Sequence, residues 1–237
     1  MLFLSSIYSS IRPSDISSYE QILVDDNKPY FFSIPKNIKT NEVMKSILHL
    51  PYLLFIENSK YDSAKRVLKK ILVNNTPDIL LSITTASCYT SNLAHLLTDS
   101  INNRFNLNDY KRQEIATCLH EAIMNSMLHG NLKMSSDFRT INGLYNYRTE
   151  IEKRLSIGMY KSRRVNIMAW NKNNCLQIAI NDEGNGFTIP NYAVNDTLPN
   201  GRGLMFIHSL ADSVWLGKDK RTLFMTFNYF LSALAIK

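Results

Sequence analysis

Two successive β-hairpin patterns in the last third of the chain constrain the fold more than any other feature. Residues 165–171 (VNIMAWN) and 175–181 (CLQIAIN) are strand-like runs joined by a Lys-Asn-Asn turn. A second pair of such runs, 213–217 and 222–230, flanks the polar stretch Lys-Asp-Lys-Arg. Alternating apolar runs separated by short polar turns are typical of antiparallel strand pairs. This part of the chain therefore predicts an antiparallel sheet.

Helices with one apolar face are expected ahead of the hairpins. Residues 91–105 and 109–129 carry apolar side chains at helical spacing, and a strand is expected just before them at 78–86. Asn108 or Asp109 can cap the longer helix, and Gly130 is expected to end it in a left-handed conformation. The combination predicts an α+β fold: a two-layer α/β sandwich whose mixed sheet is covered on one face by helices.

The chain is expected to divide near residue 77. Asn-Asn-Thr-Pro at 74–77 is a strong break signal. Before it, short strands are predicted within 19–34 and at 52–56, and a helix at 63–73. Residues 1–77 are thus expected to form a small α/β module of unknown role, and residues 78–237 the main domain.

Composition indicates a folded protein, since 45% of the residues are hydrophobic. The net charge of +7 permits a polyanionic partner, but no nucleic-acid recognition motif accompanies it, so nucleic acid is not favoured. The widely spaced Cys88, Cys118 and Cys175 suggest neither a disulfide framework nor a zinc site. No leader or membrane span is apparent, and a cytoplasmic location is expected.

Three polar residues share one stripe of the predicted helix 109–129. Glu121, Asn125 and His129 are spaced four residues apart, which brings them onto one side of a helix. A carboxylate can accept a proton from a nucleophile, and a carboxamide oxygen one turn away suits a hard cation such as Mg²⁺. An ordinary solvated helix face would carry the same residue types, so this stripe alone decides nothing.

Two glycine motifs come later in the chain. Asp182-Glu-Gly184-Asn-Gly186 directly follows the strand run 175–181. Glycines there allow close approach to a ligand, and the carboxylate can accept a hydrogen bond from an exocyclic amine. The stretch 201–204 (GRGL) precedes an apolar helix-like run, where unpaired backbone amides favour phosphate. Taken alone, the first motif could equally be a surface turn, and the second could be a tight connection before a helix.

In this order the three motifs resemble the Bergerat-fold ATPases, the superfamily that includes histidine kinases, gyrase-type ATPases and anti-sigma-factor serine kinases. Residues 121–131 (EAIMNSMLHGN) are similar to the N box of the anti-sigma branch, Glu-x-x-x-Asn-Ala-x-x-His-Gly. Ser126 stands where that branch commonly has alanine. The resemblance extends over roughly residues 78–230 and implies a Bergerat ATP-binding fold there.

The resemblance also implies roles for individual residues. Glu121 would be the general base of phosphoryl transfer, Asn125 would hold a Mg²⁺ ion that bridges the phosphates, and Asp182 would accept from the adenine amino group. Gly201 to Leu204 would wrap the phosphates, and Thr222 would support adenine recognition. Besides Asn125 and Asp182, the implied cofactor-binding residues are His129, Gly184, Gly186, Gly201, Arg202, Gly203, Leu204 and Thr222.

The function implied is that of an ATP-binding, Mg²⁺-dependent regulatory serine/threonine protein kinase of the anti-sigma-factor type, which transfers the γ-phosphate to a serine of a partner protein. The expected partners are ATP and a regulatory protein, either an anti-sigma antagonist or a sigma-factor-like protein, and a homodimer is compatible with this reading. The alternative is a non-catalytic module of a bacterial signalling pathway, in which bound nucleotide sets the shape of a protein-binding surface. Glu121 favours the kinase, because a pure binding site needs no base.

Overall fold

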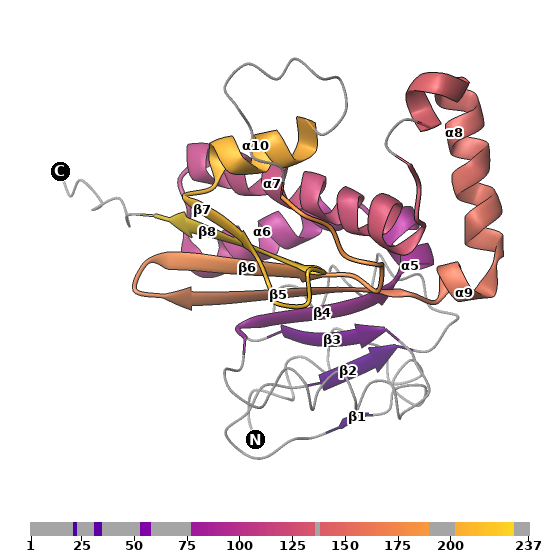
Figure 1. Ribbon diagram of the computed structural model, residues 1–237. Coiled ribbons are helices and arrows are strands. Elements are labelled where there is room, and N and C mark those ends of the chain that lie inside the picture. The colour runs from indigo at the N-terminus through magenta and orange to yellow at the C-terminus, as the bar shows by residue number, and fades with distance from the viewer. Residues whose placement is uncertain are drawn as a thin grey trace.

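The fold is built on one mixed sheet of eight strands (Figure 1). The computed structural model describes residues 77–135, 138–189 and 202–229, together with three short strands at 21–22, 31–34 and 53–57. The strand order is β1-β2-β3-β4-β5-β6-β8-β7. The strands are β1 (Gln21–Ile22), β2 (Phe31–Ile34), β3 (Leu53–Glu57), β4 (Ile79–Thr84), β5 (Arg164–Lys172), β6 (Cys175–Asn181), β7 (Ser213–Leu216) and β8 (Thr222–Asn228).

Both predicted hairpins are present. The strands β5 and β6 pair antiparallel around Asn173 and Asn174, whose φ angles of 54° and 58° are those of a tight two-residue turn. The second hairpin, β7–β8, adds to β6 through β8. Together with β4, these strands make a five-stranded antiparallel sheet, which β3 and β2 extend through parallel pairing at the β4 edge.

Helices cover one face of the antiparallel strands (Figure 1). Their bounds are α5 (Thr85–Thr90), α6 (Leu93–Phe105), α7 (Asp109–Asn125), the π-helix η1 (Ser126–Asn131), α8 (Phe138–Ser156), α9 (Gly158–Lys161) and α10 (Arg202–Leu210). The N-cap of α7 is Asn108, whose side-chain oxygen accepts from Lys111 N at 2.8 Å. Of the two predicted caps, Asn108 and Asp109, the structure therefore confirms Asn108.

The core lies between the sheet and these helices. Alternate residues of each central strand enter it, as the two-residue period of a strand requires, and they meet apolar residues of α6 and α7. Examples are Ile83, Ile167 and Ile180 from the strands, and Leu97 and Leu119 from the helices, all at most 1% exposed. The predicted two-layer α+β sandwich with a mixed sheet is confirmed.

The end of the long helix differs from the prediction. Gly130 does not adopt a positive φ angle, and the chain does not stop there. It continues from α7 into η1, which ends at Asn131. A wider π-turn of this kind is often found at functional sites. Thr85 and Ala86, which were predicted to end a strand, instead begin the short helix α5.

The boundary predicted at residue 77 falls between two strands that pair with each other, β3 and β4. The division into modules 1–77 and 78–237 stays a prediction. The predicted strands within 19–34 and at 52–56 are present as β1, β2 and β3, whereas the helix expected at 63–73 lies outside the described residues. Within the described part of the chain, no helix combines the length and the apolar character that crossing a membrane requires.

Candidate functional site

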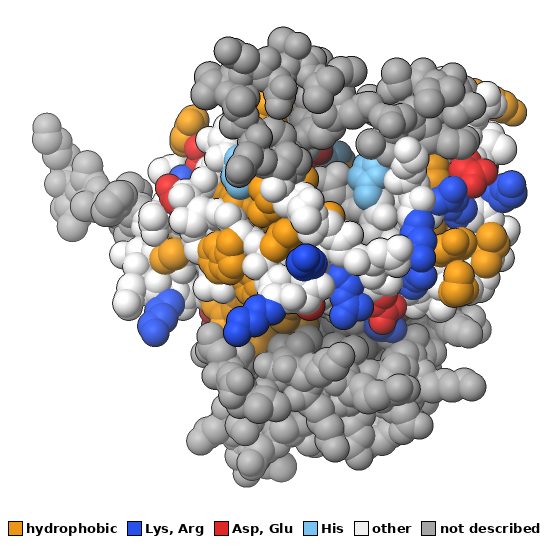
Figure 2. Space-filling model, viewed as in Figure 1, with side chains coloured by type: hydrophobic (Ala, Val, Ile, Leu, Met, Phe, Trp, Pro, Cys, Tyr) orange, Lys and Arg blue, Asp and Glu red, His pale blue; other side chains and the backbone are white. Residues whose placement is uncertain are grey.

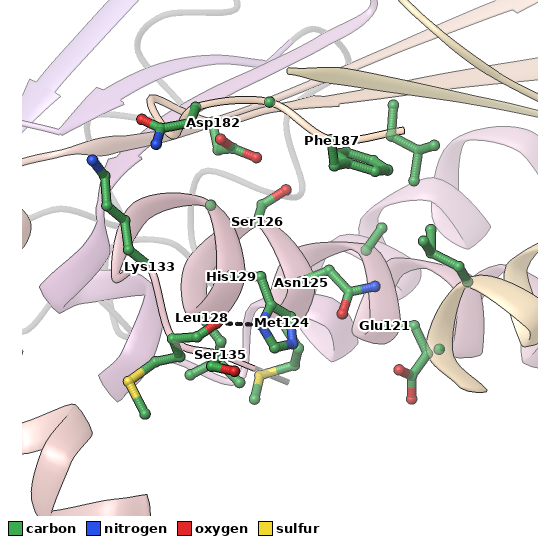
Figure 3. Close-up of a pocket in the computed structure, with 18 of the residues that line it drawn as sticks. Glu121, Met124, Asn125, Ser126, Leu128, His129, Lys133, Ser135, Asp182 and Phe187 are labelled. Carbon is green, nitrogen blue, oxygen red and sulfur yellow. Dashed lines mark hydrogen bonds between the residues drawn. The ribbon is translucent and has the colours of Figure 1, made fainter. Parts of the chain in front are cut away.

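A cavity of about 920 Å³ opens between the α7–η1 helix, the loop that follows β6, and the start of α10. Figure 3 shows Glu121, Asn125 and His129 on successive turns along one wall of the cavity, with Asp182 and Phe187 facing that wall from the opposite side. The predicted site residues that line it are Glu121, Asn125, His129, Asp182, Gly186, Gly203 and Leu204. Motifs separated by about 80 residues in sequence therefore converge on one space.

At one end of the cavity, Glu121 and Asn125 lie against the first turn of α10. A Cβ atom built on Gly203 would collide with Glu121 Oε2 and would stand 3.4 Å from Asn125 Nδ2. A side chain at position 203 would therefore have to displace the Glu121 carboxylate from its place beside α10. The N-terminus of α10 presents the positive end of a helix dipole, so this end of the cavity suits an anion.

At the other end, the Asp182 carboxylate is buried directly after β6, with 4% of the residue exposed. It accepts a hydrogen bond from Gly184 N at 2.8 Å and another from the Ser126 hydroxyl. Burial raises the pKa of Asp182 to about 6, although these two hydrogen bonds favour the ionised form and oppose the shift. A buried carboxylate with spare acceptor capacity suits a ligand that brings its own hydrogen-bond donor.

Two glycines make the approach to Asp182 possible. A Cβ atom on Gly130 would collide with the Asp182 carboxylate, with its Oδ1 only 2.6 Å away. A Cβ atom on Gly184 would stand 2.6 Å from Gly130 O. Sequence reasoning gave Gly130 a different role, that of a helix terminator, and so missed this contact. Gly130 belongs to the His-Gly-Asn sequence that ends the N-box pattern, and this was the one sequence signal that could have linked it to the site.

The third glycine of this region acts through backbone conformation. Gly186 has a φ of +85°, and a Cβ atom built on it would stand 2.8 Å from Lys220 O of the β7–β8 turn. A side chain there would be strained by the positive φ and by the contact. The two glycines of the Asp182 motif are therefore required for different reasons: Gly184 for a close backbone contact, and Gly186 for its positive φ as well as a close contact.

His129 and Lys133 line the part of the cavity beyond Asn125. His129 Nδ1 lies 2.7 Å from Met134 O. Because a carbonyl oxygen only accepts, Nδ1 is the protonated nitrogen in this contact. Lys133 adopts a φ of 54° and is the only Lys or Arg among the described lining residues. No sequence pattern pointed to Lys133.

Four predicted site residues do not line the cavity in the described structure. Gly184 lies buried behind Asp182. Thr222 Oγ1 donates to Asp219 Oδ2 at 2.8 Å, and the next residue, Leu223, is the one that lines the cavity. Gly201 lies outside the described residues. Arg202 is the first residue of α10, and its side chain is not described.

The arrangement can hold an anionic ligand that also carries a hydrogen-bond donor. The donor would reach Asp182, and the anion would reach the N-terminus of α10 beside Glu121 and Asn125. No group of three or more His, Cys, Asp or Glu residues in the described ranges could hold a metal ion alone. Mg²⁺ commonly takes one or two protein oxygens and completes its shell with phosphates and water, so the Asn125 carboxamide fits that mode.

Basic side chains do not form a single block on the face seen in Figure 2. They are interspersed with apolar and uncharged groups around the lower part of that face. Arg164, by contrast, is buried, and its Nη2 donates to Glu57 O at 2.7 Å. Part of the positive charge of the chain is therefore structural.

In a comparison with known protein families, residues 84–227 match the histidine kinase-like ATPase domain. The match runs from the last residue of β4 into β8 and includes every described residue that lines the cavity. No curated protein is significantly similar to the chain in sequence.

Proposed function

The chain belongs to the histidine kinase-like ATPase family, and from that premise we propose that it is an Mg²⁺-dependent serine kinase that regulates a partner protein. ATP binding follows from the family itself. The kinase activity, of the anti-sigma-factor type, is the further step. One observation supports it above others: Glu121 and Asn125 lie together against the start of α10, at the anion-binding end of the cavity.

ATP would lie along the cavity with its base at the Asp182 end. The ionised Asp182 carboxylate would accept a hydrogen bond from the adenine amino group. The triphosphate would extend toward Glu121 and the N-terminus of α10, where backbone amides and the helix dipole favour negative charge. Asn125 Oδ1 would hold Mg²⁺, which when bound neutralises phosphate charge and orients the phosphates for transfer.

Glu121 would act on the hydroxyl group of the incoming serine. Its carboxylate would accept the hydroxyl proton as the serine oxygen forms a bond to the γ-phosphorus. The bond between that phosphorus and the β,γ-bridging oxygen breaks, and ADP leaves. Positioning and charge neutralisation supply most of the catalysis in such reactions, which is why one carboxylate and one carboxamide can suffice here.

Nucleotide binding is tested first, by titration calorimetry with ATP in the presence and absence of Mg²⁺. Asp182→Ala should weaken binding under both conditions, because it removes the acceptor for adenine. Asn125→Ala should abolish the dependence on Mg²⁺. Equal and negligible binding by the wild type and both variants would overturn the proposed nucleotide site.

Phosphoryl transfer is tested with γ-labelled ATP and the proteins of the source cell, followed by phosphoamino-acid analysis. Glu121→Gln should retain ATP binding and lose labelling of serine. Glu114→Gln on the same helix is the matched control, because Glu114 pairs with Lys111 and does not line the cavity. ATP binding with no labelling dependent on Glu121 would support the non-catalytic module instead.

A further inference from the structure

A row of polar side chains crosses the sheet on the face opposite the helices α6 and α7. Ser82, Asn166, Asn181 and Thr222 lie directly opposite one another on β4, β5, β6 and β8. Their sequence neighbours Ile83, Val165, Ile180 and Leu223 belong to the core beneath the helices. Because side chains alternate along a strand, the polar row faces the other way.

The row is joined into a single chain of hydrogen bonds that all run in the same direction. Each member donates to the next, from a guanidinium at one end to a carboxylate at the other. The bonds are Arg164 Nε to Ser82 Oγ (2.7 Å), Ser82 Oγ to Asn166 Oδ1 (2.6 Å), Asn166 Nδ2 to Asn181 Oδ1 (3.1 Å), Asn181 Nδ2 to Thr222 Oγ1 (3.0 Å) and Thr222 Oγ1 to Asp219 Oδ2 (2.8 Å). Bonds arranged this way polarise and strengthen one another.

Both ends of this row are connected to the loop 182–187, which borders the cavity: one directly through the Arg164 backbone amide, the other through the β7–β8 turn. At the cationic end, Arg164 N donates to Glu183 Oε2 at 2.8 Å. At the anionic end, Asp219 accepts from the backbone amides of Arg221 and Thr222, each at 3.0 Å, and so holds the β7–β8 turn. The β7–β8 turn then holds the 182–187 loop through two backbone hydrogen bonds: Lys220 O accepts from Phe187 N at 2.9 Å, and Arg221 O accepts from Asp182 N at 3.3 Å.

We propose that the row from Arg164 to Asp219 positions the 182–187 loop, and with it the Asp182 and Phe187 side chains of the nucleotide site. Ser82, Asn166 and Asn181 are positioning residues, since none of them lines the cavity. This inference rests on the proposed nucleotide site for its effect on ATP, but the ordering of the loop can be measured without ATP.

The row also connects the site to the chain before the family match. Ser82 precedes the matched residues 84–227. The Arg164 side chain donates through Nη2 to Glu57 O of β3 at 2.7 Å and to Ser82 O at 2.9 Å. The Glu57 carboxylate accepts from Thr84 N and from the Ser87 hydroxyl. The β3 strand thus fixes the end of the row from which the positioning begins.

The experiment compares three full-length variants by amide hydrogen exchange and by ATP titration. Ser82→Ala removes one hydroxyl from the middle of the sheet, and Thr222→Val removes the hydroxyl that donates to Asp219. Thr226→Val is the matched control. Thr226 lies four residues along the same strand and on the same face, paired with Gln177 rather than with Asn181.

Ser82→Ala and Thr222→Val should each speed exchange of the Asp182 and Phe187 amides relative to the amides of α6. Each should also weaken ATP binding by about fivefold, the effect of one typical hydrogen bond. Thr226→Val should change neither. Unchanged exchange in the loop, or an equal increase throughout the protein, would overturn the proposal. If the wild type fails to bind ATP, the proposed function falls, and the exchange rates alone decide the role of the row.

Discussion

Gly203 at the start of α10 is in direct contact with the carboxylate of Glu121 on α7, with no room for a side chain between them. The contacting atom, Oε2, is the far end of a flexible side chain. A methyl group at position 203 would therefore displace the carboxylate and leave the helices in place.

Gly203→Ala should consequently separate binding from catalysis. We expect ATP affinity close to that of the wild type and a loss of phosphoryl transfer of about 10²-fold, the usual contribution of a general base. Gly158→Ala in α9 is the control, because a Cβ atom there meets nothing within 4 Å. Single-turnover transfer measured alongside ATP titration checks the prediction, and full activity in Gly203→Ala would contradict it.

Gly130→Ala should act on stability instead. Its methyl group would meet the Asp182 carboxylate, which is itself buried and held by Gly184 N, so neither partner can move freely. We expect a loss of about 1–3 kcal/mol in the free energy of unfolding, as for other overpacked sites. Urea denaturation measures this change, and the same Gly158→Ala variant should unfold like the wild type.

The affinity for ATP should depend on pH through Asp182. Burial raises the pKa of Asp182 to about 6. Only in the ionised carboxylate are both oxygens free of a proton, and this is the form that accepts the hydrogen bond from the adenine amino group. Binding should weaken as the pH falls through 6, by roughly tenfold at pH 5. Asp182→Asn retains every other titrating group, including those of ATP. Identical pH profiles for the wild type and this variant would contradict the prediction.

The same pKa shift predicts that Asp182→Asn stabilises the protein without nucleotide. The folded-state pKa of about 6 lies above the ordinary value of 3.8, so the ionised carboxylate costs stability at neutral pH. In the wild type, stability should rise as the pH falls from above 6 toward 4. The carboxamide oxygen that the substitution introduces can still accept from Gly184 N. We expect a gain of up to about 3 kcal/mol at pH 7 and none near pH 4, measured by denaturation at both values.

Features that depend on neighbouring residues were predictable from the sequence. The Asn173–Asn174 turn adopts positive φ angles, which asparagine tolerates better than most residues. The Asn108 cap depends on one hydrogen bond to an amide three residues later. The polar stripe of Glu121 and Asn125 follows from helical spacing alone.

Features that depend on distant contacts were not predictable. Gly130 has the local signature of a helix end, yet its environment is determined by Asp182, which lies 52 positions along the chain. The π-helix η1 forms where Ser126 and Gly130 meet that carboxylate. Whether Thr222 or Leu223 faces the cavity depends on the register between β6 and β8, in which Thr222 lies opposite Asn181. A shift of one residue in a strand reverses the face.

The parallel pairing of β3 with β4 also governs association between molecules. In the full chain β4 lies between β3 and β5, and Ile79, Leu80 and Leu81 are wholly buried. A fragment that began at residue 78 would expose the amides and carbonyls of an apolar strand along an open edge, which is a template for pairing with other chains. The leading strands thus protect the ATPase domain from aggregation, and a shortened protein should precipitate at concentrations where the full chain stays dissolved.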